Sequence, residues 1–292
     1  MTAFLQLVVS GLATGAIYAL AAIGFTLLWQ ASQTINFAQG EFIMLPAFFV
    51  LAGTHILHLP FIVSLLLSLL LSLFFLGFAF KRAIIDPMLP HGVLPIVVVT
   101  IALGLLMRDG VKEFYSAEAQ PFPALFSEET FSLFGTVISV QDIAILGISL
   151  LAVLVLHLFL THTRTGRCMQ ATAQNREVAE ILGVNVNRMI LYTFLINAAL
   201  ATMASVLISP IYLAKFSNGE SLGLIAFIAA IVGGFNQIRG ALVGGLLIGV
   251  IDNLSAAYLS ANYRTAFPLI LLLAVILIRP QGLLGQKEER TV

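Results

Sequence analysis

Long uncharged apolar segments constrain the fold of this 292-residue chain more than any other feature. A helix needs roughly 20 apolar residues to cross the hydrocarbon core of a bilayer. The stretch from Phe4 to Trp29 meets this condition without a single charged residue. It lacks a basic n-region and is longer than the apolar core of a signal peptide. We therefore expect it to be retained as a membrane helix.

Further apolar stretches follow along the chain, and some of them are short or interrupted by proline and glycine. They are residues 42–57, 59–80, 93–107, 140–160, 189–208, 222–235, 241–259 and 266–278. We predict an all-α, polytopic transmembrane helix bundle of about 8–10 membrane segments, with two pseudo-repeats and short broken helices. Residues 1–292 would form a single transmembrane domain.

The composition excludes most other classes of protein. Hydrophobic residues make up 60% of the chain and charged residues 10%, whereas a soluble domain carries about 25% charged residues. A soluble enzyme, a nucleic-acid-binding domain and a disordered protein are therefore excluded. The only cysteine, Cys168, excludes a disulfide framework and a cysteine-rich metal site. The chain has no GxxxxGK[ST] phosphate loop, and we expect no catalytic residues, no metal site and no cofactor in it.

Basic residues are distributed unevenly between the loops. Ten of the fourteen Lys and Arg residues lie in residues 81–92, 161–188, 236–240 and 279–292. By the positive-inside rule these segments face the cytoplasm, and residues 108–138 form an external loop. The side of the N-terminus stays open, because it depends on whether residues 1–57 cross the membrane twice or make a third, partial crossing.

Two polar breaks interrupt the apolar pattern at residues 34–41 and 233–240. Both combine glycine with amide side chains, which can line a cavity without a net charge. Broken segments at matching places in two halves are a good sequence indicator of a transport site. Ordinary turns between helices are the alternative. The residues that we predict to line a pathway are Asn36, Gly40, Glu41, Gly233, Gly234 and Asn236.

Glu41 and Asp252 are the acidic residues nearest the apolar spans. A charge inside a span is a candidate functional group, because burying it in lipid is costly. Glu41 could instead interact with the N-terminus of the next helix, and we favour structural pairing for both acids.

Pairs of glycines four residues apart indicate close packing between helices inside the bundle. They are Gly11 and Gly15, Gly240 and Gly244, and Gly245 and Gly249.

Residues 165–184 form the most informative polar segment. The pattern predicts a short amphipathic helix from Ala173 to Leu182 that ends at Gly183, a favoured residue just past a helix end. Ala179 and Leu182 would share one face of this helix. A polar helix between two spans on the cytoplasmic side suits docking to a soluble partner, and a solvated surface loop is the alternative.

Four motifs in this chain occur in the order and at the spacing found in one transporter family. The residues that match its cytoplasmic loop are Gly166, Arg167, Ala171, Ala173, Asn175, Ala179, Gly183 and Val184. Residues 36–42 resemble the N-F-A-x-G-E/D motif, residues 229–245 resemble a glycine-rich A-A-x-x-G-G stretch, and residues 279–283 resemble an R-P-x-G-L ending. Together these matches resemble the branched-chain amino-acid ABC importer permeases, and the length resembles the LivH-type subunit more than the longer LivM-type partner.

The resemblance implies a permease of the bacterial inner membrane with no enzymatic activity of its own. It implies a heterodimer with a LivM-like subunit and two cytoplasmic ABC ATPase subunits that bind the ATP. A periplasmic or lipid-anchored binding protein would deliver leucine, isoleucine, valine or a related amino acid. The loop at 161–188 would couple the permease to the ATPases through Gly166, Arg167, Ala171, Asn175, Ala179 and Gly183.

The chain departs from the family pattern at a few positions. Gln170 replaces an arginine of the coupling loop, Cys168 and Met169 replace small residues, and residues 236–237 are Asn-Gln in place of Gly-Ser. If the second break borders the pathway, the substrate could differ from a branched-chain amino acid. A urea, short-amide or sugar permease of the same superfamily is one alternative function, and a stand-alone secondary carrier is another.

Overall fold

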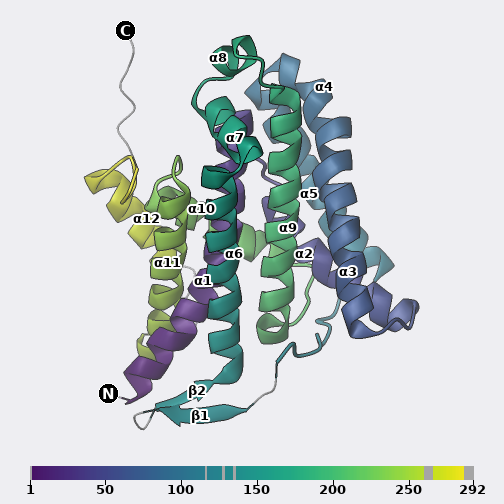
Figure 1. Cartoon of the computed structure of the whole chain (residues 1–292). Helices are drawn as coiled ribbons and strands as arrows, with labels where there is room; N and C mark the ends of the chain where they lie inside the picture. Colours follow the sequence, from purple (N-terminus) through teal and green to yellow (C-terminus); the bar gives the residue numbers. More distant parts are fainter. Residues whose placement is uncertain (1, 116, 127–128, 134–135, 260–265, 286–292) are drawn as a thin grey trace. The chain divides into compact units, whose positions relative to one another are not determined.

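The computed structural model describes residues 2–115, 117–126, 129–133, 136–259 and 266–285, and this part of the chain is almost entirely helical (Figure 1). Its only strands are β1 (Thr130–Leu133) and β2 (Thr136–Ser139), which pair antiparallel. The main helices are α1 (Thr2–Ser32), α2 (Gln39–Leu51), α3 (Phe61–Ser72), α5 (Val93–Phe114), α6 (Val140–His162), α7 (Arg164–Gln174), α8 (Arg176–Ile181), α9 (Val186–Tyr212), α10 (Asn218–Gly233), α11 (Ile238–Tyr258) and α12 (Ala266–Ile278).

Short helical turns extend two of these helices. A π-helical turn at Ala52–Ile56 continues α2, and π-helical turns at Leu73–Ala79 and Lys81–Ile85 continue α3. The short α4 (Asp86–Met88) and a 3₁₀ turn at Leu89–His91 lead on to α5. The predicted external loop at 108–138 is therefore partly helical, because α5 extends to Phe114.

In the described residues, six helical segments are long and apolar enough to span a membrane. They are Ala3–Ser32, Phe61–His91, Val93–Phe114, Val140–His162, Val186–Tyr212 and Ile238–Tyr258, and α10 and α12 are shorter apolar helices. Helices suit this environment because all their backbone hydrogen bonds form within the segment. The prediction of an all-α polytopic membrane bundle is confirmed.

The chain divides into two compact units. Unit 1 comprises Met1–Thr26, Ala124–Leu151 and Ile225–Val292, and unit 2 comprises Leu27–Pro123 and Ala152–Leu224. Three helices, α1, α6 and α10, pass from one unit into the other.

In unit 1 the glycines of α1 and α11 allow the two backbones to approach closely. A Cβ atom built on Gly15 would lie 2.8 Å from the carbonyl oxygen of Gly245, and one built on Gly245 would lie 2.5 Å from Cα of Ala19. A Cβ atom built on Gly11 would lie 2.8 Å from Cα of Val250. The glycine pairs therefore pack helices within the chain, as the sequence predicts.

Two aspartates of unit 1 are paired with hydroxyl groups of another helix. The hydroxyl of Tyr18 donates a hydrogen bond of 3.2 Å to Asp252, which is 1% exposed. The Ser10 hydroxyl donates to Asp142, in the first turn of α6. The prediction of structural pairing is thus confirmed for Asp252, since an unpaired charge in this position would be costly.

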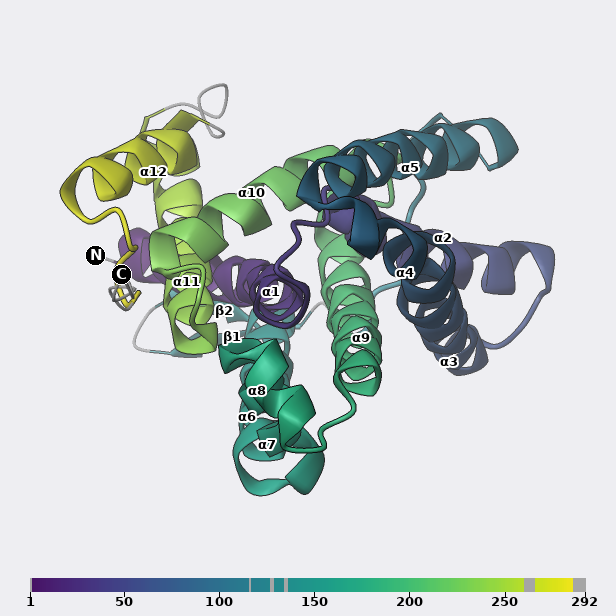
Figure 2. The same ribbon diagram turned by 90° about the horizontal axis from the view of Figure 1, so that it is seen from above.

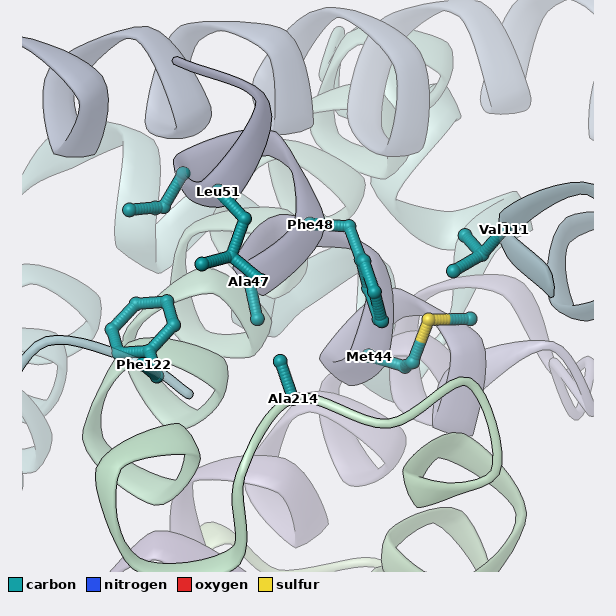
Figure 3. Close-up of a cluster of buried hydrophobic side chains, with 8 residues drawn as sticks. Met44, Ala47, Phe48, Leu51, Val111, Phe122 and Ala214 are labelled. Atoms are coloured by element: carbon teal, nitrogen blue, oxygen red, sulfur yellow. The ribbon is translucent and has the colours of Figure 1, made fainter. Parts of the chain in front are cut away.

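Unit 2 is built around α2, which contacts α3, α5 and α9; Figure 2 shows these helices side by side. A cluster of buried apolar side chains joins α2 to α5 and to the connections at 115–123 and 213–217. Figure 3 shows this cluster, which contains Met44, Ala47, Phe48, Val50, Leu51, Val111, Phe122 and Ala214.

Serine side chains compensate for a proline inside α2. Pro46 interrupts the hydrogen bonding of the helix. The backbone N–H of Ala47 donates to the Ser205 hydroxyl at 3.0 Å, and the Ser68 hydroxyl donates to the Pro46 carbonyl oxygen at 2.7 Å. Neighbouring helices thereby satisfy polar groups that lipid could not satisfy.

The two ends of α1 make polar contacts in different units. Ser10 bonds to Asp142, just after β2, whereas Ala31 accepts hydrogen bonds from Arg176 in the loop at 161–188. In unit 2, Gln39 bonds to Asn197 and Ala47 to Ser205, so α2 runs beside α9 with the same polarity.

Candidate coupling and translocation site

Two short helices, α2 and α10, start in the same way. Each follows a long helix, α1 or α9, and each connection opens on a residue with positive φ, Gln33 at 51° and Leu213 at 62°. The sequences at the two helix starts are also alike, since residues 37–41 read F-A-Q-G-E and residues 216–220 read F-S-N-G-E. The repeat thus includes an amide, a glycine and a glutamate in the first turn of each helix.

The first turns of α2 and α10 meet at three glycines, all in unit 2. A Cβ atom on Gly40 would collide with the carbonyl oxygen of Gly219, and one on Gly223 would lie 2.7 Å from Cα of Gly40. Real Cβ atoms do not approach a backbone so closely, and only glycine fits at these positions. The helix starts are therefore in direct backbone contact.

Glu41 lies at this junction with its carboxylate buried. The residue is 7% exposed, and within the described part of the chain its Oε2 atom accepts no hydrogen bond. A Cβ atom on Gly219 would lie 2.6 Å from the carboxyl carbon of Glu41, so the carboxylate is packed against the backbone of α10. Buried carboxylates are normally paired, and an unpaired one inside a membrane protein is a candidate functional group.

The α5 helix brings a positive charge to the same junction. Arg108 Nη1 lies 3.0 Å from Glu220 Oε2 and Arg108 Nε lies 3.8 Å from Asp109. One turn earlier, a Cβ atom on Gly104 would lie 3.6 Å from Cγ of Glu41. The junction therefore joins three helices, with three carboxylates around one guanidinium.

Amide groups fix the start of α2. Gln39 and Asn197, both fully buried, exchange hydrogen bonds of 2.8 and 2.9 Å between their side chains. The Asn36 side-chain oxygen accepts a hydrogen bond of 3.0 Å from the N–H of Ala38, and Thr100 accepts one of 3.3 Å from Phe37. The predicted residues Asn36, Gly40 and Glu41 thus lie within one compact region of unit 2.

The other three predicted pathway residues lie in unit 1, Gly233 at the end of α10 and Gly234 and Asn236 in the turn to α11. Gly234 has φ of 118°, and a Cβ atom on it would lie 2.6 Å from the backbone nitrogen of Gly285. The N–H of Leu283 donates to the Val232 carbonyl oxygen at 2.9 Å. The C-terminal segment therefore packs on the turn that contains Gly233, Gly234 and Asn236.

In unit 2 the first break contacts the start of α10 after the connection at 213–217, a segment that we did not pair with it from the sequence. The signal that could have revealed it is the repeated F-x-amide-Gly-Glu pattern, at 37–41 and 216–220.

The coupling loop contains two helices, α7 and α8, at the top of unit 2 in Figure 1. The prediction of one continuous helix from Ala173 to Leu182 is wrong, because Asn175 is extended, with φ −156° and ψ 111°. Its side-chain oxygen accepts a hydrogen bond of 3.0 Å from the N–H of Val178. An asparagine favours this N-cap position over the interior of a helix, so a new helix begins at Arg176.

Two glycines shape the loop. Gly183, with φ of 82°, ends α8 in a Schellman motif in which Gly183 N–H bonds to Glu180 and Val184 N–H bonds to Ala179, both at 2.9 Å. A Cβ atom on Gly166 would lie 2.5 Å from Cα of Leu160. Gly166 therefore allows α7 to fold back on the end of α6.

Several side chains of α8 are apolar and exposed. Val178, Ile181 and Leu182 are 50%, 84% and 74% exposed, and they follow the i, i+3, i+4 spacing of one helix face. Ala179 is buried at 1% exposure, so it differs in exposure from Leu182, with which we expected it to share a face. Of the other predicted coupling residues, Arg167 and Asn175 are exposed and Ala171 is half-buried.

Arg176, the first residue of α8, connects the loop to α1. Its Nε atom donates a hydrogen bond of 3.1 Å to the carbonyl oxygen of Ala31, and its Nη2 atom donates to the same oxygen. Burial of the guanidinium lowers the pKa of Arg176 from its usual value. The sequence alone did not single out this residue, because its partner is a backbone atom 145 positions away.

Comparison with known proteins identifies close relatives over the whole chain. The chain is 31% identical over 99% of its length to the high-affinity branched-chain amino acid transport system permease protein LivH of Salmonella typhimurium, 98% of which is covered. It is 32% identical to the corresponding protein BraD of Pseudomonas aeruginosa, with the same coverage. The ribose import permease protein RbsC of Haemophilus influenzae is 30% identical over 40% of this chain and 39% of its own length. No solved structure matches the chain.

The family described as "Branched-chain amino acid transport system / permease component" matches residues 7–276. This range includes both helix starts at the junction and the whole coupling loop. Together with the membrane-spanning helices, the match makes the chain a multi-pass inner-membrane protein of a transport family. The chain therefore belongs to the permease family of branched-chain amino acid transport systems.

Proposed function

We propose that the chain is the LivH-type permease subunit of an ATP-binding-cassette importer that translocates branched-chain amino acids. The observation that carries this proposal is the similarity to LivH over 99% of the chain and 98% of the relative. Matches to fructose and ribose import permeases cover only 60% and 40% of the chain. A sugar permease is therefore the second candidate. The chain would act as one transmembrane permease domain and catalyse no reaction itself.

The partners in this proposal are a LivM-like permease subunit, two cytoplasmic ABC ATPases and an extracytoplasmic substrate-binding protein. The apolar face of α8, formed by Val178, Ile181 and Leu182, suits burial in a groove of an ATPase, because an exposed apolar patch on a polar segment is typical of an interaction site. Gly166, Ala171, Asn175, Ala179 and Gly183 would shape and support this surface, and Arg167 would contact the ATPase.

The pathway in this proposal passes the junction of α2 and α10. Asn36, Gly40 and Glu41 lie there, and the buried carboxylate of Glu41 is the ionisable group on which we base this choice. Gly233, Gly234 and Asn236 would act from the turn between α10 and α11. Substrate movement would follow rocking of the membrane subunits when the ATPases close on ATP.

Reconstitution of the complete importer in liposomes tests the transport function. We expect uptake of labelled leucine that needs both the binding protein and ATP inside the liposomes, with isoleucine and valine as competitors. A variant ATPase that cannot hydrolyse ATP is the control. Competition by ribose but not by leucine would favour the sugar permease. Uptake driven by an ion gradient without the ATPases would contradict the proposal.

Two substitutions test the coupling surface. Ile181→Glu places a charge in the apolar face of α8 and should reduce co-purification of the ATPases, whereas the conservative Ile181→Val should not. Arg167→Glu should leave membrane insertion intact while ATP hydrolysis continues without uptake. Normal uptake by both charge variants would remove α8 and Arg167 from the contact.

A further inference from the structure

The bond from Arg176 to Ala31 joins the surface that faces the ATPases to the end of a membrane helix. Ala31 lies in the last turn of α1, where carbonyl oxygens have no donor within the helix. A cation at this end also complements the helix dipole, and the two donors of one guanidinium bond to a single oxygen. Charge-assisted hydrogen bonds of this kind are stronger than neutral ones.

The residues that follow Ala31 lead directly to the junction of α2 and α10. The Ser32 and Thr34 hydroxyls share a hydrogen bond of 2.6 Å, and both residues are buried. Asn36 then caps the turn at Ala38, and Gly40 touches the start of α10. A displacement of Ala31 therefore reaches the junction through fewer than ten residues, most of which are buried.

Other contacts of the loop differ from this one. Arg164, Arg167 and Arg188 are exposed, and in the described part of the chain their side chains form no hydrogen bond to another helix. Lys81 bonds to Asn187 and forms an ion pair of 2.8 Å with Asp86, which ties the start of α9 to the end of the α3 segment. The loop is thus attached to α1 through Arg176 and to the α3 segment through Lys81.

We propose that Arg176 is a positioning residue that transmits movement of α8 to the break at residues 33–38 and so to the junction of α2 and α10. The inference rests on the proposed function, because the ATPases must move α8. ATP-driven displacement of α8 pulls on the end of α1 through the guanidinium. The break after α1 then changes conformation, since it is the irregular segment next to the bond.

The first test measures uptake and ATP hydrolysis by the complete reconstituted importer. Arg176→Gln should lower leucine uptake about tenfold while ATP hydrolysis stays within about twofold, because the variant removes coupling between two sites but not docking. Arg176→Lys keeps the charge and should restore part of the uptake. Arg164→Gln, a substitution in the same loop, is the matched control and should have no effect.

The second test reports on the break itself. A nitroxide label at Gln33→Cys, with Cys168→Ser to remove the native thiol, lies in the exposed first position of the break. Trapping the importer with ATP should change the mobility of this label in the parent protein and in Arg164→Gln, but not in Arg176→Gln.

Three outcomes would overturn parts of this account. An unchanged label response and normal uptake in Arg176→Gln would remove the role of Arg176. Loss of ATPase co-purification in Arg176→Gln would show that the residue only holds α8 in place for docking. Absence of ATP-driven uptake in the parent importer would contradict the proposed function instead, before any variant is compared.

Discussion

The starts of α2 and α10 share one sequence pattern but differ in their surroundings. Glu41 of α2 is 7% exposed, whereas the Glu220 side chain of α10 is 73% exposed. Gln39 is fully buried against Asn197. The corresponding Asn218 is half-buried, and its side chain donates a hydrogen bond of 2.6 Å to the Leu213 carbonyl oxygen. The same amide, glycine and glutamate thus form a buried site in one helix and an exposed helix start in the other.

The difference shows that burial determines what these glutamates can do. The backbone of α10 at Gly219 and α5 at Gly104 pack against the Glu41 side chain, which is thereby removed from water. Glu220 keeps its solvent and forms an ion pair with Arg108 at 3.0 Å. An exposed ion pair contributes little free energy, because water screens the charges. A functional role for the carboxylate is therefore expected at Glu41 rather than at Glu220.

The largest expected effect comes from the glycines, which both helix starts need. Gly40→Ala places a Cβ atom against the Gly219 carbonyl oxygen, and neither backbone can move freely in the bundle. We expect the free energy of unfolding in detergent to fall by about 3 kcal/mol. Gly147→Ala is the matched control, because a Cβ atom there has nothing within 4 Å. Equal stability of the two variants would show that the helix starts are not in contact.

The second prediction compares the stabilising effects of the two amide side chains, Gln39 in α2 and Asn218 in α10. Gln39→Leu leaves the fully buried Asn197 side chain without its partner and should lower the free energy of unfolding by about 2 kcal/mol. Asn218→Leu removes a hydrogen bond that the side chain donates to the Leu213 carbonyl oxygen near the surface and should cost about 1 kcal/mol. The double variant Gln39→Leu with Asn197→Leu should cost less than the sum of the single variants. Chemical unfolding of purified protein measures all four.

Much of this architecture could be predicted from the sequence, because hydropathy reports directly on burial in lipid. The long spans and the packing role of Gly11, Gly15 and Gly245 follow from composition and spacing alone. The pairing of α2 with α10 could not be predicted in this way. It depends on a contact between Gly40 and Gly219, which are distant in the sequence, and apolar windows contain no information on such contacts.

The coupling loop shows the same limit at a smaller scale. We correctly predicted the position of this loop between two spans, its polar character and the end of its helix just before Gly183. The division at Asn175 was not predicted, because an amide can either cap a helix or continue it, and only the chain geometry decides. The bond from Arg176 to Ala31 likewise depends on where α1 ends in space.

The third effect tests the buried carboxylate. Glu41→Gln keeps the shape of the side chain and removes a buried charge whose Oε2 atom has no hydrogen bond in the described structure. We expect the free energy of unfolding to rise by about 1 kcal/mol and leucine uptake to fall, because function is often retained at a cost in stability. The matched variant Glu220→Gln should leave both nearly unchanged. A stability loss in Glu41→Gln would show that the carboxylate has a structural partner.

The smallest effect concerns the ion pair of Arg108. A double-mutant cycle with Arg108→Gln and Glu220→Gln should give a coupling free energy of about 0.5 kcal/mol or less, because the Glu220 carboxylate is 73% exposed. The parallel cycle of Arg108→Gln with Glu41→Gln should give a larger coupling free energy, because charges interact more strongly away from water. We expect this although the two side chains form no ion pair within 4.0 Å in the described structure. Adding salt should remove the first coupling and leave much of the second. If the Glu220 cycle gave the larger coupling, burial would not explain the difference between the two helix starts.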